Sequence, residues 1–337
     1  MKYSIIIATY NRLDEIRDLV ASFEKVDFPS EDFELVIADD GSTDGTREYL
    51  ENTEFNIDVR YFHQKNKGPG AARNLGMDKA RGEYYIFIDS DCTVPDDYLS
   101  RIDSEVDEGN LDAFGGPDTY HPDFPPLLKA INYSMTSFIG TGGTRGSKRS
   151  VTRFYPRSFN MGIHRSVYEK IGGMGSLRHG QDMDFSARIY KAGFKVGLIE
   201  DAFVYHKRRT NLRRFFKQIF NWGVARINLS KKHKGLLKPI HLAPAIILLG
   251  TLIIFLLAPF NTFFEGLGFL ILLFGLFLAI YVFVESSWIY KSIRVGLLSV
   301  LTIYIQIIAY GLGTLSGLFQ RLLGRETATG FSKNYYK

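Results

Sequence analysis

Residues 3–12 read YSIIIATYNR, and residues 34–45 read ELVIADDGSTDG. Each stretch is a short apolar run that ends abruptly in polar, turn-forming residues. Residues 3–8 and 34–38 predict buried strands, because short apolar runs bounded by turn signals are typical of a sheet covered on both faces. Between them, residues 13–23 have helical spacing, so the two stretches read as strand, crossover helix and second strand.

The same alternation continues through the first ninety residues. Residues 43–52 and 70–80 have helical spacing, and residues 59–62 and 84–88 read as strands. Strands separated by helices imply right-handed crossovers and a mostly parallel sheet. In such sheets ligands bind beyond the carboxyl ends of the strands.

Polar side chains follow three of these strands. In chain order they are Thr9, Tyr10, Asn11 and Arg12, then Asp39, Asp40, Ser42, Thr43 and Asp44, then Asp89, Ser90 and Asp91. Because the carboxyl ends of parallel strands meet at one edge, we expect these groups to line one crevice. Ser42, Thr43 and Asp44 precede a helix, so helix capping explains them at least as well as ligand binding.

Five of these residues are aspartates, and capping does not explain four of them. Asp39, Asp40, Asp89 and Asp91 repel one another at one sheet edge unless a cation joins them. A hard divalent ion with oxygen ligands and a bound diphosphate would supply that compensation. We therefore expect Mg²⁺ or Mn²⁺ at this edge.

Four motifs in order resemble the opening of the family 2 glycosyltransferases, which have the GT-A fold. They are SIIIATYNR at 4–12, ADDGSTDGT at 38–46, NKGPGAARNLG at 66–76 followed by ARGEY at 80–84, and DSD at 89–91. Any one of them is a modest signal, but four in this order are a strong one. The resemblance covers the chain to about residue 230 and implies an α/β, Rossmann-like nucleotide-sugar-binding domain with a mostly parallel sheet.

The resemblance also implies roles on the donor side. Tyr10 and Asp40 should contact the nucleotide base, with Asp39 beside them, and Asp89 should face the ribose. Arg73 should lie close to the nucleotide, although an exposed ion pair is the ordinary alternative for an arginine.

The remaining donor-side residues concern the diphosphate and the metal. Asp91, the last residue of the family's Asp-x-Asp element, should bind Mg²⁺ or Mn²⁺ bridging the diphosphate. Thr9, Asn11 and Arg12 complete the expected donor site. His206 follows the strand-like residues 202–205; the family implies that it completes the metal shell, and a structural histidine is the alternative.

The expected general base is Asp182. The family places a Glu-Asp or similar pair here, and in this chain Gln181 replaces the glutamate. A carboxylate at this point can accept the proton of an acceptor hydroxyl while its oxygen attacks the anomeric carbon from behind, which inverts the configuration. Asp182 also suits a cap of the helix over 183–192, and Asp184 is the second candidate for the base.

Glycine-rich segments interrupt the pattern after residue 110. Gly115, Gly116 and Pro117 predict a flexible loop, as do residues 141–146. The second segment reads as a mobile acceptor-side flap or as a plain loop.

The charge is divided between two regions. Of 36 acidic residues only Glu265, Glu285 and Glu326 follow Asp201, while the whole chain has a net charge of +5. A basic second region favours nucleic acid or an anionic membrane as partner. Residues 242–260, 266–284 and 295–319 carry no charge, and about 20 apolar residues span a bilayer as helix. We therefore expect transmembrane helices and contact with anionic lipid, and no nucleic-acid partner.

The domain organisation follows from these patterns. We expect a glycosyltransferase domain over 1–210, a basic interfacial amphipathic helix over 211–238, two to three transmembrane helices over 239–320 and a polar tail over 321–337. A core helix of the soluble domain is the competing interpretation of residues 212–229. Cys92 is the chain's one cysteine, which predicts neither a disulfide framework nor a cysteine-based metal site.

Localisation and topology are expectations of the same kind. Residues 2–7 lack the long apolar core of a secretory signal, so we expect a multi-pass protein of the cytoplasmic membrane with its catalytic domain in the cytoplasm. Three full spans would place Arg321 and the cations after it outside, against the positive-inside rule. Either the rule is broken, or the third segment, with Gly311, Gly313 and Gly317, is interfacial or re-entrant.

The sequence thus predicts a metal-dependent, inverting hexosyltransferase. The expected donor is a UDP-, GDP- or dTDP-linked sugar, and the expected acceptor is a hydroxyl of a lipid-linked or cell-surface glycan. Two alternatives stay open. One is a polyprenyl-phosphate sugar synthase, whose anionic acceptor needs no base. The other is a non-enzymatic membrane partner that binds glycolipid.

Overall fold

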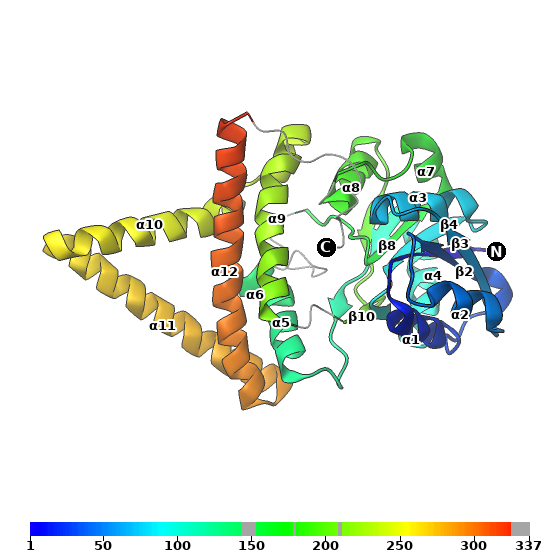
Figure 1. The fold of residues 1–337 in the computed structure, drawn as a ribbon, viewed down its shortest axis with the longest axis horizontal. Coiled ribbons are helices and arrows are strands. Elements are labelled where there is room, and N and C mark those ends of the chain that lie inside the picture. Colours follow the sequence, from blue (N-terminus) through cyan, green and yellow to red (C-terminus); the bar gives the residue numbers. More distant parts are fainter. Residues whose placement is uncertain (143–152, 178–179, 208–210, 325–337) are drawn as a thin grey trace. The chain divides into compact units, whose positions relative to one another are not determined.

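The computed structural model describes residues 1–142, 153–177, 180–207 and 211–324. The chain divides into two compact units (Figure 1). Within the described residues, the first unit contains 1–121 and 142–207, and the second contains 122–141 and 208–324. This division differs from the uninterrupted domain over 1–210 that the sequence predicted, because residues 122–141 pack with the C-terminal helices. The expected flap over 141–146 and the polar tail over 321–337 lie largely outside the described residues.

A seven-stranded sheet forms the centre of the first unit, in the order β3-β2-β1-β4-β8-β6-β9. Its strands are β1 (Tyr3–Thr9), β2 (Phe33–Asp39), β3 (Asp58–His63), β4 (Tyr84–Asp89), β6 (Ala113–Gly115), β8 (Asn160–His164) and β9 (Val196–Leu198). β1 pairs in parallel with β2 and β4, and β8 runs antiparallel to β4 and β6. The predicted mostly parallel sheet is confirmed, and all four strands predicted in the first ninety residues form.

Helices cover both faces of this sheet. They are α1 (Leu13–Phe23), the one-turn η1 (Ser30–Asp32), α2 (Thr46–Asn52), α3 (Pro69–Lys79), α4 (Tyr98–Gly109), α7 (Arg165–Ile171) and α8 (Gln181–Lys191). Successive strand residues point to opposite faces. Ile5 and Ile7 therefore pack with α1 and α4, while Ile6 packs with α3 and α8. Side chains buried on both faces explain the continuous apolar runs in the sequence.

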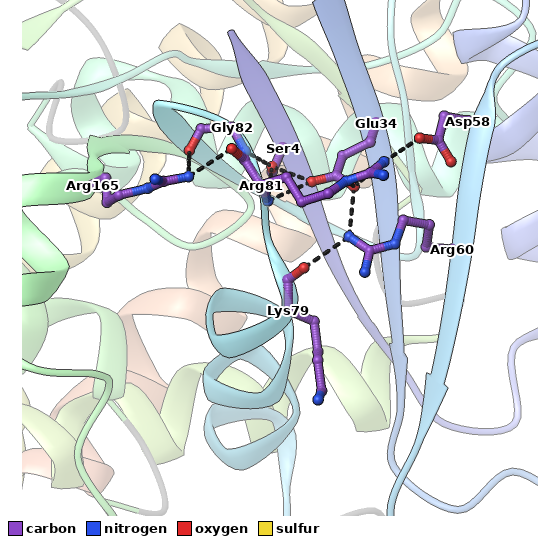
Figure 2. Close-up of polar contacts among 8 residues, drawn as sticks. All are labelled: Ser4, Glu34, Asp58, Arg60, Lys79, Arg81, Gly82 and Arg165. Atoms are coloured by element: carbon purple, nitrogen blue, oxygen red, sulfur yellow. Dashed lines mark hydrogen bonds and ion pairs between the residues drawn. The ribbon is translucent and has the colours of Figure 1, made fainter. Parts of the chain in front are cut away.

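The edge where the strands begin is held by a buried carboxylate (Figure 2). The Glu34 side chain is fully buried and accepts hydrogen bonds from Ser4 Oγ at 2.6 Å, Arg60 Nη1 at 2.9 Å and Arg81 N at 2.7 Å. Gly82 lies against Ser4, and a Cβ there would lie 2.7 Å from the Ser4 nitrogen. The ARGEY segment thus has a structural role at the edge opposite to the carboxyl ends of β1, β2 and β4.

A second sheet has the order β5-β10-β7, with β5 (Cys92–Thr93), β7 (Asp118–Thr119) and β10 (Val204–His206). The loop leading into β7, which its glycines predicted to be flexible, is closely packed. A Cβ on Gly116 would overlap the carbonyl oxygen of Ala202. Asn160 Nδ2 donates to that oxygen at 2.7 Å. The glycines here allow a close backbone approach between segments far apart in the sequence.

The second unit is helical. It contains α5 (Pro126–Thr136), α6 (Phe138–Thr141), α9 (Leu212–Lys232), α10 (Ala243–Leu257), α11 (Thr262–Tyr290) and α12 (Ile293–Leu322), with short turns η2 (Lys234–Leu236), η3 (Pro239–Leu242) and η4 (Ala258–Phe260). In the described part of the chain, three helices are long and apolar enough to cross a membrane: Pro239–Phe260, Thr262–Tyr290 and Ile293–Leu322.

α9 packs within this helical unit. Phe215 and Ile219 are buried in one cluster with Ile131, Met135 and Ala309. The cations of α9 listed here are exposed: Arg213, Arg214, Lys217, Lys231 and Lys232. The helix is therefore amphipathic, as its sequence predicted.

Candidate active site

The loops that follow β1, β2 and β4 lie at one edge of the sheet. Thr9 is in register with Asp39, and Ala8 is in register with Asp89. The aspartates that end β2 and β4 thus flank the end of β1. The convergence expected from the strand pattern follows from this register, since parallel neighbours end side by side.

Asp39 and Asp40 are fully buried and hydrogen-bonded to the protein itself. Asp39 accepts from Ser42 N at 2.8 Å, Ser42 Oγ at 2.6 Å and Tyr61 Oη at 2.7 Å. Burial and, to a smaller extent, the hydrogen bond to Asp39 raise the pKa of the Tyr61 phenol.

Asp40 accepts from Gln64 Nε2 at 2.7 Å, Lys67 N at 2.8 Å and Gly68 N at 2.7 Å. The inference that a cation must relieve the charge of these two aspartates is therefore wrong, because protein donors compensate it. Their contact with a nucleotide base stays a prediction.

Asn11 ties the first loop to the second. Its backbone has a positive φ of 50°, a conformation that asparagine tolerates better than most residues. Its N–H donates to Ser42 Oγ at 2.8 Å, and its Oδ1 accepts from Thr43 N at 2.7 Å. Asp44 accepts from Leu13 N at 2.9 Å and from Thr46 Oγ1 at 2.6 Å. The polar run of residues 42–44 is thus occupied in holding the two loops together. The N-cap of α2 is Gly45, with no side-chain capping bond, so none of these three residues is that helix's N-cap.

Two arginines face the aspartates after β4. Arg73, on α3, is buried, and its Nη2 lies 2.5 Å from Asp89 Oδ1. The exposed-ion-pair alternative for Arg73 is therefore wrong. Burial lowers the pKa of Arg12, but the charges of Asp91, Glu15 and Asp89 outweigh it and raise the pKa above its ordinary value. Arg12 donates to Glu15 at 2.7 Å and lies in the field of both aspartates.

Asp91 faces His206 across the small sheet. β5 and β10 are antiparallel, with His206 opposite Cys92, and Asp91 Oδ1 lies 3.2 Å from His206 Nε2. The other ring nitrogen, Nδ1, donates to Asp118 Oδ2 at 3.1 Å. Burial lowers the pKa of His206, but Asp91 and Asp118 outweigh it and raise that pKa to about 9. The imidazole is thus held between two carboxylates.

These residues fit a divalent metal. Among the described residues, Asp91, Cys92 and His206 offer ligand atoms within 4.8 Å of one another. Adjacent ligands of an octahedral ion at about 2.1 Å lie about 3 Å apart, close to the 3.2 Å between Asp91 Oδ1 and His206 Nε2. A ligand histidine ordinarily donates its second nitrogen to a carboxylate, as His206 does to Asp118. Cys92 belongs to the apolar core, so the oxygen and nitrogen pair are the natural ligands.

Asp118 is the site residue that sequence reasoning missed. Its carboxylate is buried. It lies in a two-residue strand, parallel to β10, with Val204 opposite. Too short to produce a hydrophobic pattern, that strand offered no signal for pairing across 88 residues.

Asp182 lies in the first turn of α8, after the N-cap Gly180. Its carboxylate is about 22% exposed, accepts from Met183 N at 2.8 Å and lies 3.5 Å from Arg157 Nη1. It is therefore both hydrogen-bonded to the helix start and open to solvent. Asp184, by contrast, is fully buried and pairs with Arg188 at 3.3 Å, which leaves Asp182 as the better candidate for a base.

The start of α8 packs against the start of α3. A Cβ on Gly70 would lie 2.6 Å from Gln181 Oε1, so the Gln181 side chain rests on the bare backbone of α3. Arg73 follows one turn later on α3 and reaches Asp89. Through α3, the Asp182 segment and the aspartates after β4 belong to the same edge. Thr9 is buried there, and Tyr10 is half-buried.

Family models match most of the chain. A model of glycosyl transferase family 2 matches residues 4–172, and one of glycosyl transferase family 21 matches residues 150–305.

Curated relatives are glycosyltransferases and a polysaccharide biosynthesis protein. The chain is 37% identical over 217 residues to a poly(ribitol-phosphate) beta-N-acetylglucosaminyltransferase of Staphylococcus aureus, covering 61% of this chain and 35% of that protein. It is 28% identical over 222 residues to the GalNAc(5)-diNAcBac-PP-undecaprenol beta-1,3-glucosyltransferase of Campylobacter jejuni, covering 64% of this chain and 66% of that protein. It is 28% identical over 258 residues to a succinoglycan biosynthesis protein of Rhizobium meliloti, covering 74% of this chain and 77% of that protein. The chain thus spans only about a third of the Staphylococcus relative.

One similar solved structure is a mannosyltransferase from Pyrobaculum calidifontis in complex with GDP-Man and Mn²⁺. The similarity covers 93% of this chain and 87% of the mannosyltransferase chain, with a TM-score of 0.63 and 18% sequence identity. At that identity the likeness shows the fold, a GT-A-like α/β domain. With the family 2 model matching from residue 4 to residue 172, the chain belongs to glycosyl transferase family 2.

Proposed function

We propose that this protein is an inverting glycosyltransferase that moves a sugar from a nucleoside-diphosphate sugar to a hydroxyl of a lipid-linked or cell-surface glycan. One observation carries the proposal. Asp91 and His206, which follow and face the end of β4, could hold a metal, and the partly exposed carboxylate of Asp182 lies beside Gln181, which packs on the start of α3.

The donor would bind where the loops after β1, β2 and β4 meet. The loops around Asn11 and Asp40 are held in place by hydrogen bonds. They would place Tyr10 and backbone groups of both loops against the nucleotide base. Arg73, already bound to Asp89 at 2.5 Å, would hold that carboxylate toward the ribose. Arg12 would lie near the diphosphate, where its charge favours the negative leaving group. UDP, GDP and dTDP remain candidates for the nucleotide.

Asp91 and His206 would hold Mg²⁺ or Mn²⁺ against the diphosphate. When bound, such an ion neutralises the charge that develops on the departing nucleoside diphosphate. Asp118 would keep the Nδ1–H of His206 occupied, so that Nε2 presents its lone pair to the metal side. The mannosyltransferase of the same fold, whose complex contains GDP-Man and Mn²⁺, supports this expectation.

Asp182 would act as the general base. Its carboxylate would accept the proton of the acceptor hydroxyl as the oxygen forms a bond to the anomeric carbon. The bond from that carbon to the diphosphate oxygen breaks in the same step, and the nucleoside diphosphate leaves. A single displacement of this kind inverts the anomeric configuration.

The acceptor and the location follow from the relatives and the helices. The Campylobacter relative's name specifies an undecaprenol-linked glycan, and the second unit has three helices apolar enough to span a bilayer. The exposed cations of α9 would lie within the attractive surface potential of anionic headgroups at the cytoplasmic face. These features favour an acceptor that is itself bound to the membrane.

A thermal-shift screen of nucleoside diphosphates with and without Mn²⁺ tests the proposal. A ligand at 100 times its dissociation constant stabilises the native state by about 2.7 kcal/mol. One base should therefore raise the melting temperature by several degrees, and Mn²⁺ should increase the shift. Asp91→Asn should lose the Mn²⁺-dependent part. If no nucleoside diphosphate stabilises the detergent-solubilised protein with or without metal, the proposed activity is wrong.

A further inference from the structure

The three apolar helices of the second unit differ in how much of their surface the protein covers. Of the residues in an apolar 18-residue stretch of each helix, 6% are buried in Pro239–Phe260, 11% in Thr262–Tyr290 and 44% in Ile293–Leu322. A helix surrounded by lipid should be apolar and uncovered on all sides. The first two segments have this property, and the third does not.

The exposed side chains are also distributed differently. On α10 adjacent residues such as Phe255, Leu256 and Leu257 are all exposed, and on α11 so are Leu272, Leu273 and Phe274. Adjacent residues point in different directions on a helix, so lipid can reach most of the circumference.

On α12 the exposed apolar residues form one stripe. Its members are Ile293, Leu297, Leu301, Ile308, Leu312, Phe319 and Leu322. Their spacings of three, four and seven residues place them on one face. The buried residues Ser299, Thr302, Gln306 and Gly313 lie on the opposite face. This division is that of a helix at an interface and not of a helix immersed in lipid.

The covered face of α12 makes close and polar contacts. A Cβ on Gly313 would overlap the carbonyl oxygen of Phe220 on α9. Thr302 Oγ1 accepts from Ser134 Oγ of α5 at 2.6 Å, and Gln306 Nε2 donates to Gly140 O of α6 at 2.5 Å. α5, α6 and α9 thus form a layer behind α12, on the side away from its apolar stripe.

The charged residues around α10 and α11 are distributed as expected for a single transmembrane hairpin. α10 and α11 extend from α12 and meet at their far ends, around η4 (Figure 1). Glu265 is the one charged residue between Lys238 and Glu285. Lys238 comes before η3 and α10, Lys291 follows α11, and Arg294 is in the first turn of α12, so all three lie beyond the helix ends that are remote from η4. A third crossing by α12 would move Arg321 to the opposite side, against the enrichment of cations in cytoplasmic segments.

We propose that only α10 and α11 cross the bilayer, as one helical hairpin, and that α12 lies along the cytoplasmic surface with its apolar stripe in the acyl boundary. α5, α6 and α9 then form the layer between α12 and the cytoplasm. The proposal rests on the membrane location given above but not on the chemistry of sugar transfer.

Single-cysteine accessibility tests this topology in the full chain. Cys92 is 1% exposed, so the unaltered protein serves as the unlabelled background. Asn261→Cys reports the turn after η4, Arg321→Cys reports the end of α12, and Glu108→Cys reports the first unit; all three positions are exposed. Each variant, expressed in a bacterium, is treated in spheroplasts with a membrane-impermeant maleimide before and after permeabilisation.

We expect Asn261→Cys to react in intact spheroplasts, and Arg321→Cys and Glu108→Cys to react about tenfold less until the membrane is opened. Reaction of Arg321→Cys on the same side as Asn261→Cys would mean three spans and would overturn the proposal. So would protection of Asn261→Cys together with Arg321→Cys. If Glu108→Cys and Arg321→Cys both react outside while Asn261→Cys is protected, the hairpin stands and the proposed cytoplasmic location is wrong.

Discussion

Asp118 Oδ2 lies 3.1 Å from His206 Nδ1, and the opposite ring nitrogen lies 3.2 Å from Asp91. The two carboxylates therefore set both the orientation and the proton of the imidazole. With Nδ1–H held by Asp118, neutral His206 can offer Nε2 to a metal without rotating.

Replacing Asp118 with asparagine should weaken metal binding. An amide can donate to Nδ1 as well as accept from it, so the required tautomer is no longer enforced. Loss of such a partner ordinarily lowers metal affinity about 10- to 100-fold. Calorimetric titration of the detergent-solubilised protein with Mn²⁺ and the preferred nucleoside diphosphate measures this directly. Asp201→Asn, at an exposed position, is the control, and equal affinities for the two variants would remove Asp118 from the site.

The first sheet was predictable from sequence because its strands are buried on both faces. Ile5, Ile6 and Ile7 are each fully buried against different neighbours, and this burial is what produces a continuous apolar run. The aspartates at the strand ends were equally visible, since parallel strands end at one edge. The partners of these side chains could not be predicted, because Asp39 and Asp40 accept hydrogen bonds from the loops around them.

Contacts between remote short segments could not be predicted. Asp118 and His206 are 88 residues apart and lie in strands of two and three residues. Ser134 and Thr302, which join α5 to α12, are 168 residues apart. Neither pairing leaves a periodic trace in the sequence, because each depends on where the rest of the chain brings the two segments.

The effect of Asp182→Asn on turnover should distinguish transfer to an acceptor hydroxyl from transfer to an acceptor phosphate. A general base contributes about 10²- to 10⁴-fold to such a reaction, so turnover should fall by at least about 10²-fold while KM for the donor changes little. The measurement is steady-state release of nucleoside diphosphate with the acceptor.

The matched control is Asp14→Asn, which removes an exposed carboxylate from the first turn of α1. It should leave turnover nearly intact. If Asp182→Asn also leaves turnover nearly intact, the acceptor supplies its own negative charge, as a polyprenyl phosphate would.

Glu34→Gln should destabilise the first unit. Burial alone would raise the pKa of Glu34, but hydrogen bonds from Ser4, Arg60 and Arg81 lower it below the ordinary 4.5. Because both arginines are partly exposed and can be rehydrated, the loss should be about 1–3 kcal/mol and not the full cost of breaking a buried pair. The melting temperature in detergent at pH 7 should fall by several degrees. Glu51→Gln, which breaks an exposed pair with Arg47, should not lower it measurably.

The same pKa shift fixes the sign of the pH dependence. A carboxylate whose pKa is lower in the folded state stabilises the fold above its unfolded pKa, and this stabilisation disappears as the pH falls through the folded pKa. The difference in melting temperature between the unaltered protein and Glu34→Gln should therefore be constant near neutrality and shrink below pH 4.5. A difference that grows on acidification would contradict the assignment of an ionised Glu34.

Gly313→Ala should weaken the packing of α9 against α12. Its Cβ would overlap the backbone oxygen of Phe220, which cannot move aside as a side-chain terminus could. Overpacking of this kind ordinarily costs about 1–3 kcal/mol, so the detergent-solubilised variant should melt several degrees lower. Gly250→Ala on α10 is the control, because nothing lies within 4 Å of the Cβ it would add and alanine favours helix by about 1 kcal/mol over glycine. Opposite shifts for the two variants are expected, whereas equal shifts would mean that α9 and α12 do not depend on this contact for their packing.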